Sequence, residues 1–180
     1  MRKVISLGIG LVIGGLLLGS GVSLSEQAKE NLVKNHSFEQ VDAQGMPKGW
    51  IAWPGNEGAK YWQPGIYFSS SDDAHSGKNS AYIKLEDCKR GVQWQRNLKL
   101  SPDTTYTASA CIETKDLQPG GRVLYIGMYV GTLELAKQGK LKSHSKHGPR
   151  IKGTTDWTYY KLTFTLPRSR CIGVTFFLLS

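Results

Sequence analysis

The chain has 180 residues, a net charge of +9, five Trp and eight Tyr. The positive charge is unevenly spread: six Lys and Arg residues lie between residues 137 and 152, a stretch without an acid, and two more lie at the N-terminus. The rest of the chain is near neutral, which argues against nucleic-acid binding because that depends on a broad basic surface. The basic stretch is typical of a solvated loop, and attraction to an anionic polymer or cell surface is the alternative.

Residues 1–25 are predicted to be a secretory signal peptide. Arg2 and Lys3 precede an apolar run to about residue 18, and small residues follow it, in the order that a cleaved leader requires. An uncleaved membrane anchor is the alternative, since the apolar stretch extends weakly to Leu24. Residues 26–180 are then one domain, outside the cell or in the cell envelope, with no membrane contact after cleavage.

Three cysteines, Cys88, Cys111 and Cys171, do not determine a disulfide pairing. One disulfide with one free thiol is open, and so are three small buried residues. Their spacing contains no zinc motif.

Six segments alternate apolar and polar residues with a period of two, between turns rich in Gly, Pro, Asn and Asp. They are residues 81–86, 95–100, 106–114, 121–130, 158–167 and 171–179. The one candidate helix, residues 131–142, is short. The pattern predicts an all-β fold, a β-sandwich of two antiparallel sheets.

Residue patterns of common enzymes are missing: there is no nucleophile elbow, P-loop, HExxH or dinucleotide fingerprint. The acidic residues lie mostly at turns, and their spacing singles out no catalytic pair. His144 and His147, among lysines and before Gly-Pro, are interpreted as loop residues rather than metal ligands. The chain is therefore predicted not to be an enzyme.

Aromatic residues exceed what a β core of this size requires, and several lie beside amide or guanidinium groups. Flat rings stack on the apolar face of a sugar while amides pair with its hydroxyls. For one of these residues, Trp94, packing in the core with Val92 and Leu98 is the alternative. The predicted carbohydrate contacts are Trp53, Trp62, Trp94, Arg96 and Tyr129.

Four motifs occur in a fixed order between residues 31 and 178: "NLVKNHSFEQ…GMPKGW", "AHSGKNSAYIKL", "LSPDTTYTASACIET" and "IKGTTDWTYYKLTFTLP". Each resembles an element of the carbohydrate-binding modules of the cellulase C type, the CBM-cenC family. The resemblance implies a jelly roll like that of galactose-binding domains, in an accessory module of a secreted glycoside hydrolase.

The same resemblance implies one structural calcium ion. Glu39 matches its carboxylate ligand, and backbone carbonyls near Gly77 and Lys78 match a second contributor. The family closes with an Asp-rich strand that supplies another carboxylate, and this sequence has no counterpart. The ion is then absent or weakly held, or the chain is a fragment that lacks the last strand.

A version of the chain extended by such a closing strand is expected to melt at a higher temperature, because the strand would cover an exposed sheet edge. Thermal unfolding of both versions checks this, and equal melting temperatures would contradict it.

The predicted function is that of a secreted, non-catalytic module that binds a polysaccharide or a cell-surface glycan. Two alternatives stay open: an accessory module or fragment of a glycoside hydrolase, and a structural or adhesive β-sandwich of the cell surface. The sequence predicts neither the glycan nor the oligomeric state.

Overall fold

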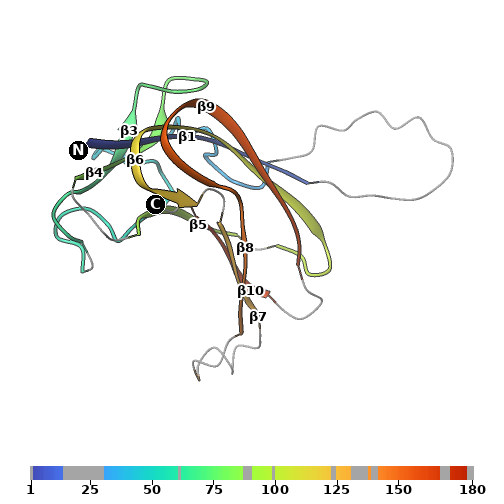
Figure 1. The fold of residues 1–180 in the computed structure, drawn as a ribbon. Coiled ribbons are helices and arrows are strands. Elements are labelled where there is room, and N and C mark those ends of the chain that lie inside the picture. Colours follow the sequence, from blue (N-terminus) through green and yellow to red (C-terminus); the bar gives the residue numbers. More distant parts are fainter. Residues whose placement is uncertain are drawn as a thin grey trace.

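The computed structural model describes residues 2–13, 31–60, 62–86, 91–98, 100–122, 125–130, 138, 142–166 and 171–177. In residues 2–13, 119–122, 125–130, 142–144 and 171–177 it describes the backbone alone. The described residues form strands and turns without a helix, and Figure 1 shows their arrangement. The candidate helix at 131–142 falls almost wholly outside them.

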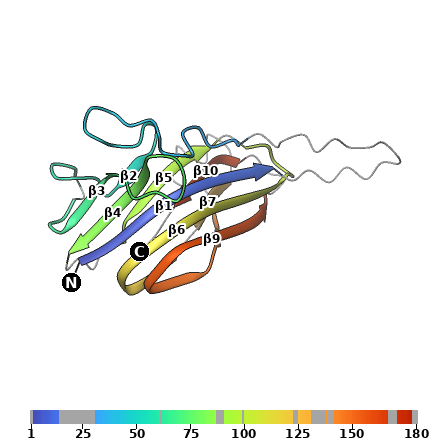
Figure 2. The same ribbon diagram turned by 90° about the horizontal axis from the view of Figure 1, so that it is seen from above.

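The described residues form ten strands, which build two antiparallel sheets of five strands each. The first sheet has the order β3-β4-β1-β6-β9 and the second the order β2-β5-β10-β7-β8. Figure 2 shows the first sheet face-on. The strands are β1 (Arg2–Ile13), β2 (Ile51–Trp53), β3 (Ile66–Ser71), β4 (Ser80–Glu86), β5 (Gln93–Leu98), β6 (Thr105–Arg122), β7 (Tyr125–Val130), β8 (Lys142–His147), β9 (Arg150–Thr165) and β10 (Cys171–Phe177). The predicted all-β sandwich is confirmed.

All six segments with period-two alternation become strands, which are β4, β5, β6, β7, β9 and β10. One prediction is wrong. The stretch around His144 and His147 was expected to be a loop, but Lys142–His147 is strand β8, paired antiparallel with β7. An edge strand made of polar residues carries no apolar alternation, so the sequence pattern did not indicate it.

The core lies between the sheets and is made from the alternate residues that pattern analysis assigned to one face. Ile83, Ala108 and Ile112 of the first sheet are buried, and so is Trp94 of the second. Trp94 meets Phe68 of the first sheet edge-to-face, with ring centroids 5.1 Å apart. This contact joins the two sheets through a geometry that aromatic pairs prefer.

The segment before β2 is fixed to the core by two aromatic residues. Phe38 is fully buried, Trp50 is nearly so, and their ring centroids lie 5.0 Å apart. The indole Nε1 of Trp50 also donates a hydrogen bond of 3.0 Å to the carbonyl oxygen of Asn35. Both rings therefore support the segment that leads into β2, as a core anchor should.

Asn35 organises the turn between these rings. Its Nδ2 donates to the carbonyl oxygens of Gln40 and Lys48, at 2.8 and 3.0 Å, and its Oδ1 accepts from the N–H of Gln40 at 3.0 Å. Its φ of 52° lies in the left-handed region, which Asn tolerates better than most residues. The Asn35 side chain thus provides hydrogen-bond partners for three backbone groups of this turn, two carbonyl oxygens and one N–H.

Replacing Asn35 with Ala is expected to destabilise the protein by about 2 kcal/mol, because three hydrogen bonds are lost and Ala is strained at positive φ. Chemical denaturation of the variant measures the loss. Lys34→Ala, which changes an exposed neighbour, is the control. Equal unfolding free energies for the two variants would contradict this role of Asn35.

Candidate functional site

The outer face of the second sheet combines an aromatic residue with a row of amides. Along β5, Trp94 points into the core, so Gln93, Gln95 and Asn97 fall on the opposite face. Of these three, Gln93 is buried, Gln95 is partly exposed and Asn97 is exposed. Trp53 of β2 lies directly opposite Gln93, and Ile51, 45% exposed, lies opposite Gln95. The Nε2 of Gln93 donates to the Oε1 of Gln95 at 3.2 Å. Amide donors and acceptors are thereby held in fixed positions next to an indole ring.

The register continues these rows across the other three strands of the sheet. Directly paired positions share a face, and pairing carries the row of Gln95 to Phe177, Tyr125 and His147. The row of Asn97 continues in the same way to the positions 175, 127 and 145. We call this surface the amide–aromatic face, with the members Ile51, Trp53, Gln93, Gln95 and Asn97 and the register positions Tyr125, Gly127, Tyr129, Ser143, Ser145, His147, Thr175 and Phe177.

Two of the predicted contacts belong to this face. Trp53 is half-buried and lies at its β2 end. Tyr129 has its register position on the same face, paired with Gly173 and Ser143, although its side chain lies outside the described part. The sequence placed Tyr129 opposite the apolar side of its strand, and the register agrees.

Trp94 does not reach this face. Its side chain is fully buried, and its Nε1 donates to the carbonyl oxygen of Tyr82 at 3.3 Å. A sugar has no access to this ring, so the core-packing alternative raised from the sequence describes Trp94 in this structure. The reason is parity: Trp94 shares its side of β5 with Leu98, which packs against the core.

Arg96 has the same parity as Trp94 and is half-buried. Its Nη1 donates to the carbonyl oxygen of Gly49, just before β2. Gly49 has a φ of 78°, and a Cβ there would collide with the guanidinium. Arg96 therefore ties β5 to the turn that delivers Trp53, a supporting role for the amide–aromatic face.

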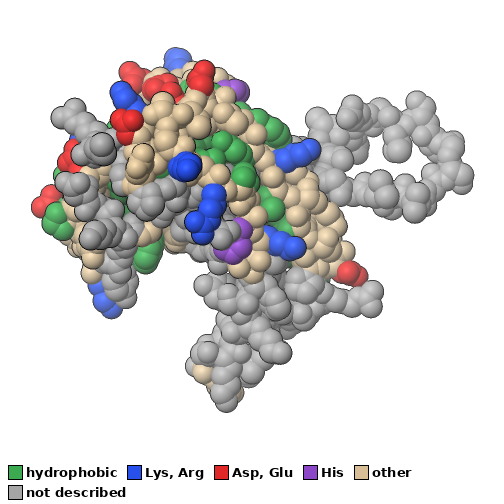
Figure 3. All heavy atoms as spheres, viewed as in Figure 1, with side chains coloured by type: hydrophobic (Ala, Val, Ile, Leu, Met, Phe, Trp, Pro, Cys, Tyr) green, Lys and Arg blue, Asp and Glu red, His purple; other side chains and the backbone are tan. Residues whose placement is uncertain are grey.

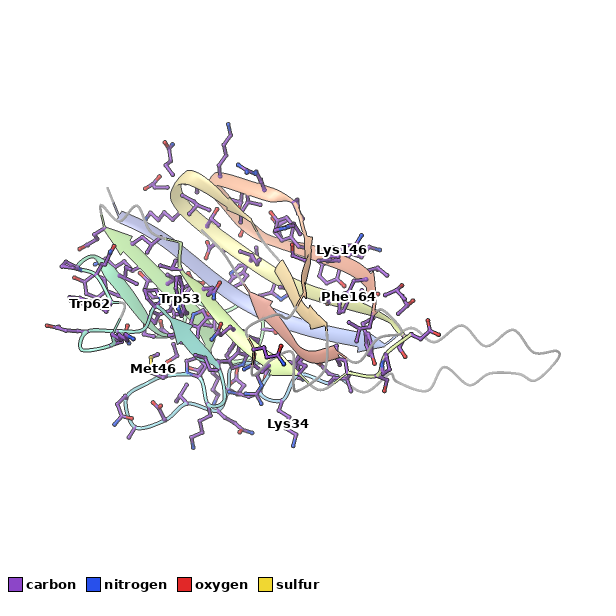
Figure 4. All side chains as sticks on the ribbon, turned by 90° about the horizontal axis from the view of Figure 1, so that it is seen from below. Lys34, Met46, Trp53, Trp62, Lys146 and Phe164 are labelled. Atoms are coloured by element: carbon purple, nitrogen blue, oxygen red, sulfur yellow. The ribbon has the colours of Figure 1, made fainter. Side chains whose placement is uncertain are left out.

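Trp62 lies away from Trp53, in the turn between β2 and β3, as Figure 4 shows. It is partly buried against the core, and its Nε1 donates to the carbonyl oxygen of Ile66 at 3.0 Å. The structure thus does not bring Trp62 together with the amide–aromatic face.

Glu39 joins the first loop to the segment before β4. Its Oε1 accepts hydrogen bonds from the backbone N–H groups of Lys78 and Asn79, at 2.8 and 3.0 Å. Gly77 has a φ of 76°, and a Cβ there would collide with the carboxylate. The N–H groups of Asn79 and Lys78 hold the pKa of Glu39 below its ordinary value. The carboxylate therefore links the first loop to the segment before β4.

A calcium ion at Glu39 stays a prediction. Calcium takes six to eight oxygen ligands. Among the residues that the structure describes, no group of three acidic, His or Cys side chains could hold a metal ion. At Glu39 the Oε1 atom of the carboxylate accepts two N–H groups.

A group of acids lies on the first sheet. Burial raises the pKa of Glu113, and the neighbouring carboxylates of Asp73 and Asp156 raise it further. Figure 3 shows acidic side chains gathered at the upper edge of that view. Glu113 belongs to β6, so the whole sandwich separates this group from the amide–aromatic face.

The free thiol of Cys111, also on β6, is partly buried, and this burial raises its pKa. The side chains of Cys88 and Cys171 lie outside the described part, so the disulfide pairing stays open.

Sequence reasoning missed Asn97 and Phe177 as members of the face, and it placed Tyr125 on the same side as Tyr129 without naming it among the contacts. The signal was present for Asn97, because Gln93, Gln95 and Asn97 are three polar residues at a period of two. Phe177 was assigned neither to the core nor to a surface, since its strand is apolar at almost every position.

A comparison with protein families matches residues 30–178 to the model of a carbohydrate-binding domain. No curated protein matches the chain.

Stability is expected to fall with acid more steeply than it does in the variant Glu39→Gln. Because the folded-state pKa of Glu39 lies below its unfolded value, its contribution is present above the unfolded pKa and is lost as the pH falls through the folded one. Melting temperatures between about pH 6 and pH 2 measure the effect. Glu57→Gln, at an exposed position, should keep the wild-type slope, and an unchanged slope in Glu39→Gln would contradict this role.

Proposed function

Because the chain belongs to a family of carbohydrate-binding domains, we propose that it is a non-catalytic module that holds a polysaccharide or oligosaccharide on its amide–aromatic face. The observation that supports this surface best is the alternation along β5, which buries Trp94 and leaves Gln95 partly exposed and Asn97 exposed on the other face. Gln93 shares that face beside Trp53 but is itself buried.

The chemistry of this face suits a sugar. A pyranose has an apolar face of C–H groups and a rim of hydroxyls that both donate and accept hydrogen bonds. An indole ring accommodates the former, and amide side chains, each with donors and an acceptor, pair with the latter. Because Gln93 and Gln95 bond to each other, their orientation is set before the ligand arrives, which lowers the cost of ordering them.

The length of the face suits a chain of sugars better than a single ring. Rows two residues apart on one strand are separated by roughly 7 Å, and adjacent strands by about 4.8 Å. The register carries such rows over five strands, from β2 to β8. A ligand that crosses several rows would meet one set of polar and aromatic positions after another.

Within the family we place the module with the cellulase C type, on the order of its four motifs, and outside the cell, on its leader-like N-terminus. No helix in the described part of the chain has the length and apolar character to span a membrane. An adhesive role through protein contacts is the rival that the binding experiment below would reveal.

Replacement of Trp53 with Ala is expected to weaken retention by a polysaccharide about fivefold to tenfold, because the stacking surface is lost. Affinity electrophoresis in gels that contain different polysaccharides, after a glycan array has selected them, measures the change. Gln95→Ala should weaken retention less, since it removes hydrogen bonds that water partly replaces.

Tyr159→Ala is the matched control, because Tyr159 is an aromatic residue that is 61% exposed on the other sheet. It should bind like the wild type, and all variants should keep the wild-type melting temperature within a few degrees. Equal losses for Trp53→Ala and Tyr159→Ala, or no retention of the wild type on any polysaccharide, would overturn the proposal.

A further inference from the structure

Strand β1 occupies an interior position of the first sheet, between β4 and β6, as Figure 2 shows. It runs antiparallel to both, and its register pairs Arg2 to Leu7 with β4 and Val4 to Ile13 with β6. β4 and β6 therefore meet through β1. Without it, two facing lines of backbone N–H and C=O groups would lose their partners, and an unpaired edge attracts another strand.

The sequence of β1 alternates in step with the core. Positions 5, 7, 9, 11 and 13 are Ile, Leu, Ile, Leu and Ile. The register sets them opposite residues that are all buried: Ile83 and Thr114, Ala81 and Ile112, Ala110, Ala108, and Tyr106. The positions between them are Val4, Ser6, Gly8, Gly10 and Val12, which the register sets on the outer face of the sheet. A leader needs apolar residues in any order, whereas this order is that of a strand with one buried face.

Residue size is complementary as well. Three of the buried positions that flank β1 are alanines, Ala81, Ala108 and Ala110. The register sets Leu7, Leu11 and Ile9 directly opposite them. Small residues on β4 and β6 thus face positions of large residues on β1, and alternation of large and small residues is what a close-packed core requires.

The same twelve residues carry the charge and most of the apolar run of the predicted leader, and cleavage near residue 25 would remove them. We propose that the position between β4 and β6 is a strand-acceptor site for an extended polypeptide with large apolar residues at alternate positions. Residues 2–13 fill it before cleavage, and a strand of this pattern from a partner polypeptide fills it afterwards. Such pairing gains affinity from the backbone and specificity from alternate side chains. The proposal rests on export of the chain, and it is independent of sugar binding.

A first experiment tests the register in the uncut chain. Ile9→Lys places a charge at a core register position, whereas Ser6→Lys places the same charge on the outer face of the same strand, opposite Tyr82 and Glu113. Ile9→Lys should lower the melting temperature by about 5 °C or more, and Ser6→Lys by less than about 2 °C. Equal effects of the two variants would overturn the placement of β1.

A second experiment tests the acceptor site. A protease site inserted between residues 14 and 30 allows the folded chain to be cut, after which a dye-labelled peptide of residues 2–13 is added in excess. The cut chain should exchange its own strand for the labelled peptide, and the uncut chain should take up no label. A peptide of the same composition with its apolar residues moved by one position is the control, because a one-residue shift sends them to the wrong face.

Removal of the cut strand should lower the melting temperature, and the labelled peptide should restore it. A cut chain that loses the strand without change in melting temperature, or that takes up both peptides equally, would overturn the proposal. The chain without residues 2–13 can associate with itself. Association that the peptide reverses supports the acceptor site, whereas association that the peptide cannot reverse would place a second copy of the chain there and overturn the partner strand. If the exported protein retained residue 2, its own strand would still fill the site, and this would contradict a partner strand there. The placement of β1 that the first experiment tests could still be correct.

Discussion

The alternation of side chains across β5 is the constraint on which the candidate site depends. Trp94 fills the core and meets Phe68 of the opposite sheet, so the residues on either side of it must face outward. A slip of one residue in the pairing of β5 would turn the Gln95 amide toward the core and expose the indole, at a free-energy cost that is large against the stability of a typical domain. The position of the polar groups is therefore set by the fully buried residue of their strand, Trp94.

In the first loop, too, buried aromatic residues set the positions of residues nearer the surface. Phe38 and Trp50 pack in the core, the Asn35 side chain closes the turn between them, and the chain leaves Trp50 directly into β2. Arg96 then holds Gly49 from the side of β5. These contacts explain why a loop of twenty residues ends at a defined point, and why Trp53 arrives opposite Gln93 rather than one position away.

The fold could be predicted from the sequence where burial imposes a period of two, as in β4, β6 and β9, because each of these strands has one face in the core. Prediction failed for β8, whose residues are polar on both faces. It could not detect β1, whose charge and hydropathy fit a leader as well as a strand. For the site, the residue types were predicted better than their positions. Gln93, Gln95 and Trp53 lie on one face of their sheet, whereas Trp94 and Arg96 lie on the face that packs against the core. The sequence of β5 alone does not tell which of its two faces is buried; the pairing with neighbouring strands does.

Strand β8 also decides how the second sheet ends. Among the described strands it is the outermost of that sheet, and its sequence, KSHSKH, places lysines and histidines at that edge. Positive charge and bulky polar groups on an edge oppose the addition of another strand, since two such edges repel each other. The basic residues of this stretch thus oppose edge-to-edge pairing of two copies of the sheet, at the border of the amide–aromatic face.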